Sequence, residues 1–261
     1  MPFRNACIII RSIIKNTRMA FIIHADKINK NAFKALITGE YVGVEIKFAE
    51  NFEMLVSNRT PEFLKMNPYG KIPVLETPDG PLFESNAIAR YVARLKSDTS
   101  LFGSSLIEYG QVEQWIDFAS LEIDSNMVRW FRPSFGFDNY NAPAEELAIA
   151  NLKRALGVLN TYLASNDFLV GESVTLADII TTCNLYLGFK YLMTKTFTSE
   201  YPHIERYFWT MVDQPNFSKV LPKTKQRDDV PPVLYGKYTT QPKEDGPKKE
   251  ESKEYVKVEA N

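Results

Sequence analysis

The sequence has 261 residues, enough for one or two domains, and 44% of them are hydrophobic, which suffices for a sizeable core. Its 31 basic and 32 acidic residues give a formal net charge of -1, so charge provides no reason to expect direct nucleic-acid binding. Two cysteines and two histidines offer neither a disulfide framework nor a structural zinc site, and no apolar run is long enough to span a membrane. We therefore expect a cytoplasmic protein without a bound metal.

The first 18 residues differ from the rest of the chain. Residues 1–18 hold four basic residues, five isoleucines and no acid, which is a weak match to an organellar transit peptide. The alternative is an extension upstream of a second start at Met19. In either case we treat 1–18 as an atypical N-terminal extension and leave it out of the fold prediction.

Residues 19–98 alternate between strand and helix patterns, which predicts a small mixed sheet covered by helices. Gly43 is expected to end the first helix, and Thr60-Pro61-Glu62 has the cap, proline and acid typical of a helix start. The predicted elements are a strand over 21–24, a helix over 31–43, a strand over 44–48, a helix from 60, a strand after Pro73, a returning strand at 82–83 and a helix after 84–86.

Residues 104–221 have almost no strand signal, and their apolar residues recur at helical spacing. Helices are predicted over 106–130, 144–164, 174–193 and 204–212, with a break over 132–143 that contains two prolines. From residue 222 onward prolines alternate with lysines and acids, and large apolar residues are scarce. Such a composition cannot offset its ordering entropy, so 222–261 is predicted to be a disordered charged linker or tail.

The strongest chemical motif is Lys71-Ile72-Pro73 followed by Glu84-Ser85 at a helix start. Free backbone N–H groups and the Ser85 hydroxyl suit a carboxylate, and Glu84 can pair with an ammonium. Together they suit an α-amino acid end, such as the γ-glutamyl end of glutathione. A proline before a strand is often cis, which would leave Ile72 free to pair with an extended peptide. The alternative is that Glu84 and Ser85 only cap a helix and that Pro73 only begins a strand.

The segment NPYGKIPVLETPDGPLFESNAIARYV (67–92) resembles the glutathione transferase superfamily. The resemblance implies a cis-proline at Pro73, a backbone contact from Ile72, γ-glutamyl binding by Glu84 and Ser85, and Lys71 near the glycyl carboxylate. FLVGESVTLAD (168–178) resembles the buried capping motif of the same superfamily. There Thr175 caps a helix and Asp178 reaches back to it, so both residues are assigned to folding and not to chemistry.

One branch matches further segments. ITGEYVGVEIKF, EQWIDFASLEI and RYFWTMVDQPNF are similar to the gamma subunits of translation elongation factor 1 over roughly 19–221. The resemblance implies a thioredoxin-like N-terminal domain over 19–98, an all-helical C-terminal domain over 104–221 and the start of a linker. It does not extend to the second, C-terminal domain of that family, so a splice form or truncated gene model is an alternative to a complete product.

The resemblance also implies a function. A subunit of this branch would be a scaffold that docks exchange-factor subunits of the beta or delta type during protein synthesis, with homodimer formation as a further option. The loop from His24 to Asn31 has no tyrosine, serine or cysteine to hold a glutathione thiolate. Lys27, Lys30 or Asn29 could assist, whereas Asp26 would oppose an anion.

We therefore predict no catalytic residue and no cofactor, with glutathione only as an optional ligand. Two alternatives stay open. The first is an active glutathione transferase that conjugates electrophiles. The second is a glutathione-binding stress or redox module.

Overall fold

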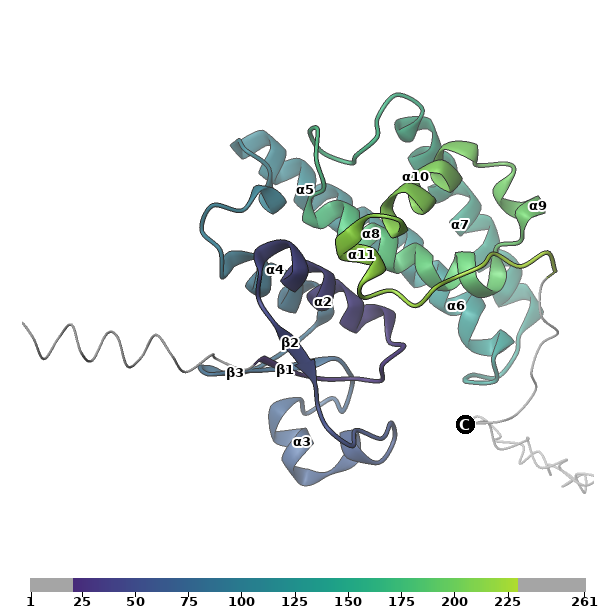
Figure 1. The fold of residues 1–261 in the computed structure, drawn as a ribbon. Coiled ribbons are helices and arrows are strands. Elements are labelled where there is room, and N and C mark those ends of the chain that lie inside the picture. The colour runs from purple at the N-terminus through teal and green to yellow at the C-terminus, as the bar shows by residue number, and fades with distance from the viewer. Residues whose placement is uncertain (1–20, 230–261) are drawn as a thin grey trace, which may run out of the picture.

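The computed structural model describes residues 21–229, so the predicted extension over 1–18 and the tail beyond residue 229 lie outside the described residues. Within 21–229 the strands form one four-stranded sheet in the order β2-β1-β3-β4 (Figure 1). Strand β1 (Phe21–His24) is parallel to β2 (Ile46–Phe48) and antiparallel to β3 (Val74–Thr77), which forms a hairpin with β4 (Gly80–Phe83). This is the mixed sheet that the alternating pattern predicts.

Two helices lie between this sheet and the helical half of the molecule (Figure 1). Helix α2 (Lys30–Val42) begins at the Asn29 cap and ends at Gly43, whose φ of 73° is a left-handed conformation that glycine adopts without strain. Helix α4 (Ser85–Arg94) packs beside α2, and both contact α8. The short 3₁₀ helix η1 (Ser57–Arg59) and helix α3 (Pro61–Met66) complete this half.

The rest of the described chain is helical, and no strand follows Phe83 within residues 21–229. Its elements are η2 (Ser100–Phe102), α5 (Leu106–Phe118), η3 (Ala119–Asp124), α6 (Ser125–Ser134), α7 (Ala142–Leu163), α8 (Leu176–Leu187), η4 (Gly188–Leu192), α9 (Lys195–Thr198), α10 (Pro202–Val212) and α11 (Pro215–Ser218). Helix α8 is buried along almost all of its length and forms the centre of the core.

Two proline-based predictions were wrong. The helix expected to end at residue 130 continues to Ser134 with Pro133 inside it, and the helix stops one residue after this proline, which lacks the N–H that a longer helix needs. The sequence pattern places Pro143 in the break, but it lies in the first turn of α7, where the missing N–H needs no partner. The predicted helix over 106–130 also contains a π-helical segment, η3, and the side chain of Asn184 donates to the Ala119 carbonyl there at 3.1 Å.

Residues 222–229 contradict the predicted start of the disordered tail. They lie along the helical half and end beside α9 (Figure 1). The Gln226 side chain is only 5% exposed, and its Nε2 donates to the Met193 carbonyl at 3.0 Å and to Thr198 Oγ1 at 2.8 Å. The backbone N–H of Lys195 donates to the Arg227 carbonyl at 3.3 Å. The packed chain therefore extends past residue 221, because one buried amide finds partners that the composition of the segment does not reveal.

The Gln226 contacts give a test of this packing. Gln226→Ala is expected to lower the free energy of unfolding by about 1–3 kcal/mol, because it removes two buried hydrogen bonds and leaves the Met193 carbonyl without this donor. The measurement is denaturant unfolding of the full chain. Lys225→Ala, at the exposed neighbouring position, is the matched control. Equal stability of the two variants would show that residues 222–229 do not contribute to folding.

Candidate functional site

The β3–β4 hairpin brings the two parts of the predicted glutathione motif to the same end of the sheet. Val74 pairs with Phe83, so Pro73 and Glu84, the next residues outward, lie at the same end of the hairpin. The Ile72–Pro73 peptide bond is cis. Glu84 is exposed and has a φ of 70°, an uncommon conformation for a residue other than glycine, and Ser85 begins α4 directly after it. The structure thus places Ile72, Pro73, Glu84 and Ser85 around one helix start.

The loop that leads into the cis-proline is held by side-chain amides. Asn58 Nδ2 donates to the Gly70 carbonyl at 2.7 Å, and Asn67 Nδ2 donates to the Lys71 carbonyl at 2.8 Å. Both asparagines are buried. The Lys71 side chain is exposed, with its ammonium 4.3 Å from the centroid of the Tyr69 ring. Lys71 is therefore at the edge of the site and free to meet an anion from solvent.

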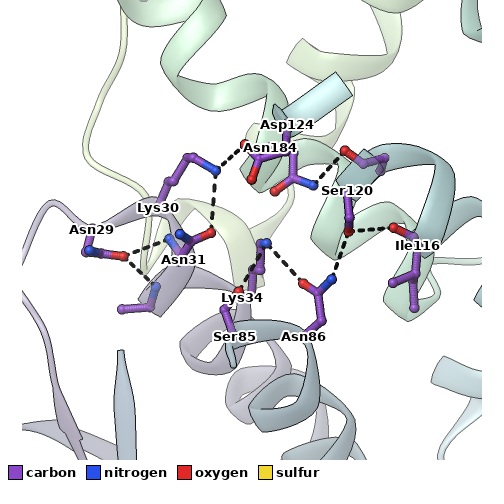
Figure 2. A network of polar contacts seen from close by, with 12 residues as sticks. Asn29, Lys30, Asn31, Lys34, Ser85, Asn86, Ile116, Ser120, Asp124 and Asn184 are labelled. Carbon is purple, nitrogen blue, oxygen red and sulfur yellow. Dashed lines mark hydrogen bonds and ion pairs between the residues drawn. The ribbon is translucent and has the colours of Figure 1, made fainter. Parts of the chain in front are cut away.

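A buried lysine that the sequence analysis missed lies behind the start of α4 (Figure 2). Lys34 is only 2% exposed, and its Nζ lies 3.3 Å from Ser85 Oγ and 3.0 Å from Asn86 Oδ1. Asn86 Nδ2 in turn donates to Ser120 Oγ at 2.8 Å. The sequence contains a signal for this burial. Lys34 lies four residues after Lys30 and three residues before Ile37, so the two lysines share one face of α2 with an apolar residue.

Lys30 lies one turn before Lys34, at the first residue of α2, and contacts the helical half of the molecule. Its Nζ lies 2.5 Å from Asp124 Oδ1 at the end of η3, and the side chains are 6% and 20% exposed. This ion pair and the Lys34–Asn86–Ser120 chain run side by side across the boundary between the two halves (Figure 2). The start of α4 is therefore connected through side chains to the helical half.

Burial governs the titration of this network. Desolvation, followed by the neighbouring charge of Lys30, lowers the pKa of Lys34 to about 8, against smaller upward effects of Asp124, Cys183 and Glu84. Burial also raises the pKa of the Cys183 thiol to about 12, so this thiol is protonated near neutral pH. Cys183 is consequently unsuited to act as a nucleophile.

A separate cleft of about 470 Å³ opens between the β1–α2 loop and the helical half. Within this loop the Asn29 side chain is engaged as the cap of α2, Lys30 is paired with Asp124, and the Lys27 side chain is exposed. Burial raises the pKa of Asp26. The cleft is lined by Asp26, Ile28, Asn29, Lys30, Asn31, Val128, Phe131, Arg132, Phe135, Phe137, Tyr186, Leu187, Lys190 and Tyr191. Glu84 and Ser85 do not line it, so this cleft is distinct from the motif at the start of α4.

The predicted cap lies in the core, away from both sites. Asp178 is fully buried and accepts hydrogen bonds from the Leu169 and Thr175 N–H groups at 2.9 and 2.8 Å and from the hydroxyls of Thr175 and Tyr207 at 2.9 and 3.0 Å. Asp178 reaches back to Thr175 at the start of α8, which is capping-box geometry. All four donors are part of the fold, so no acceptor capacity is directed at a ligand.

Comparison with known families agrees with this architecture. The profile described as "Glutathione S-transferase, N-terminal domain" matches residues 24–94, and "Glutathione S-transferase, C-terminal domain" matches residues 118–215. The matched ranges correspond to the sheet-containing half and to most of the helical half. The predicted fold class, a thioredoxin-like domain followed by an all-helical glutathione-transferase domain, is confirmed.

Curated relatives carry a common name. "Elongation factor 1-gamma" of Prunus avium is 66% identical over 226 residues, which cover 87% of this chain and 54% of the relative. "Probable elongation factor 1-gamma 1" of Arabidopsis thaliana is 63% identical over 89% of this chain and 56% of the relative. "Elongation factor 1-gamma" of Homo sapiens is 40% identical over 85% of this chain and 51% of the relative. The chain spans about half the length of these relatives.

Solved structures share the fold at lower identity. The GST-like domain of elongation factor 1-gamma from Saccharomyces cerevisiae matches with a TM-score of 0.70 and 20% identity, covering 83% of this chain and 99% of that chain. A glutathione transferase from Phanerochaete chrysosporium, in complex with oxidized glutathione, matches with a TM-score of 0.70 and 26% identity, covering 77% and 94%. Among residues 21–229, no helix combines the length and apolarity needed to cross a membrane.

Proposed function

The chain belongs to the elongation factor 1-gamma family, and from this membership we propose that it acts in the cytoplasm as a non-catalytic scaffold subunit of the translation elongation factor 1 complex. In this complex it docks exchange-factor subunits of the beta or delta type. The side chains of the β1–α2 loop support the proposal that the protein is not catalytic. Lys30 is held by Asp124, and the loop from His24 to Asn31 contains no tyrosine, serine or cysteine that could donate a hydrogen bond to a glutathione thiolate.

A two-armed experiment on the full chain tests this proposal. In one arm the protein is titrated with purified beta-type and delta-type exchange subunits, and binding is expected. In the other arm it is incubated with glutathione and a reactive aryl halide, and little conjugation is expected. Conjugation at about 1–1000 per second, typical of enzymes, without subunit binding would support the alternative of an active glutathione transferase and overturn the scaffold proposal.

We also propose that the start of α4 binds the γ-glutamyl end of glutathione, or of a similar ligand, as a retained site. In this proposal the Ile72 backbone pairs with the ligand and Glu84 binds its ammonium. Ser85 donates to the γ-glutamyl carboxylate, and Lys71 lies near the glycyl carboxylate. The supporting observation is the hairpin register, which brings Pro73 and Glu84 to the same end of the sheet beside the cis peptide bond.

Ser85→Ala tests this site. The substitution is expected to weaken glutathione binding by about 10- to 100-fold, because a hydrogen bond to a charged group contributes about 1.5–3 kcal/mol. The dissociation constant is measured by calorimetry on the full chain. Ser97→Ala, an exposed serine in the connection after α4, is the matched control. Equal affinity of both variants and the wild type would exclude Ser85 from ligand binding.

A further inference from the structure

In the part of the chain that the structure describes, no acid contacts the buried charge of Lys34. Taking an ammonium out of water is unfavourable unless it is paired, and buried lysines normally have a carboxylate partner. Lys34 Nζ instead contacts two neutral oxygens, Ser85 Oγ and Asn86 Oδ1. Within residues 21–229 no carboxylate lies at ion-pair distance from it. The positive charge behind the start of α4 is therefore not cancelled by direct contact.

The contact with Lys34 determines the direction of the Ser85 hydroxyl. An ammonium can only donate hydrogen bonds, so Ser85 Oγ is the acceptor in this pair. The hydroxyl proton must then point away from Lys34, and in the described part of the chain it donates to no acceptor. Ser85 is consequently available as a hydrogen-bond donor on the side of the site away from Lys34.

The backbone at the same position also lacks a cap. Glu84 occupies the N-cap position of α4, but no side chain within residues 21–229 accepts from the first N–H groups of this ten-residue helix. Those groups carry the positive end of the helix dipole. Free N–H groups, a free hydroxyl donor and an uncancelled buried ammonium thus converge on one point, and each of them favours a negative charge.

We propose that Lys34 is the positioning residue of a carboxylate site at the start of α4: it turns the Ser85 hydroxyl outward as a donor and supplies the positive charge that holds the carboxylate. The inference rests on the proposed γ-glutamyl site and deepens it, because it assigns the preference for an anion to a side chain that does not touch the ligand. Asn86 links the same ammonium to Ser120 on η3 and so holds it in place.

This role makes binding dependent on pH. The charged groups that face Lys34 are Lys30 on α2, Asp124 on η3, Cys183 on α8 and Glu84 before α4. With its pKa lowered to about 8, Lys34 is charged at neutral pH and neutral at high pH. A bound carboxylate favours the charged form and raises this pKa. Affinity is therefore full below pH 8 and falls as the pH rises above it.

The first test uses S-methylglutathione, which has no free thiol, and the full chain. Lys34→Met keeps the volume and removes the charge, and it is expected to weaken binding about tenfold at neutral pH. Lys65→Met, at an exposed position of α3, is the matched control. In the double variant Lys34→Met/Ser85→Ala the combined loss should be smaller than the product of the single losses, because Lys34 acts through Ser85.

The second test separates a positioning role from a structural one. The affinity of the wild type should fall as the pH passes 8, relative to the Lys34→Met protein, which lacks this titration. If Lys34→Met does not fold, the Lys34 side chain of the wild type is titrated by NMR with and without S-methylglutathione, and the ligand should raise its pKa.

The outcomes are distinct. Binding by the wild type that is unchanged in Lys34→Met, or a ligand that leaves the Lys34 titration unaltered, overturns the role of Lys34 and leaves the γ-glutamyl site intact. No binding by the wild type overturns both the site and this role. Neither result affects the scaffold proposal, which the titration with exchange subunits tests independently.

Discussion

Asp178→Ala is expected to lower the free energy of unfolding by about 3–5 kcal/mol, because it leaves several buried donors without an acceptor. The fully buried carboxylate accepts from two backbone N–H groups and two hydroxyls, and it connects the start of α8 with Tyr207 on α10 and with Leu169. The measurement is equilibrium unfolding in denaturant. The fraction that stays folded should bind glutathione or exchange subunits as the wild type does.

Two variants make this prediction specific. Asp138→Ala removes an aspartate whose ion pair with Arg132 is exposed, so it should change the free energy of unfolding by less than about 1 kcal/mol. Asp178→Asn keeps one acceptor oxygen and should fall between the wild type and the alanine variant. A stable Asp178→Ala protein that no longer binds any ligand or partner would reverse the assignment of Asp178 from folding to function.

Breaking the Lys30–Asp124 ion pair should have the second large effect. Lys30→Met is expected to cost about 2–4 kcal/mol of folding free energy, because it leaves a largely buried carboxylate at the boundary between the two halves without its partner. The double variant Lys30→Met/Asp124→Leu removes both charges, and it should recover most of this loss. Thermal and denaturant unfolding of the full chain measure both effects.

The control for the ion pair is Lys195→Met. Lys195 pairs with Asp228 at 2.7 Å, but both side chains are exposed, so removing this charge should change stability by less than about 1 kcal/mol. A Lys30→Met protein as stable as Lys195→Met would show that the pair is solvated in solution. It would then not contribute to holding the two halves together.

Much of the fold follows from the sequence alone, because it depends on local chemistry. Alternation of strand and helix patterns over 21–48, the turn over 77–81 and helical spacing after residue 104 indicate a mixed sheet followed by helices, and the structure has this order. Gly43 ends α2 because a left-handed residue is needed there. The motif at 71–73 and 84–85 is also visible in the sequence, since proline, acid and serine have local roles that their spacing reveals.

The connections between distant residues were decided only by the tertiary structure. Lysine is a charged residue that is normally exposed to solvent. Lys34 is nevertheless buried, because α2 packs against α4 and α8 and brings Ser85 and Asn86 within contact of its ammonium. Asp124 and Gln226 also meet their partners only in the folded chain. Asp124, for example, pairs with Lys30, which is 94 positions away in the sequence. Sequence periodicity reports which side of a helix is apolar, but the free energy of a buried polar group depends on partners that only folding brings within hydrogen-bond distance.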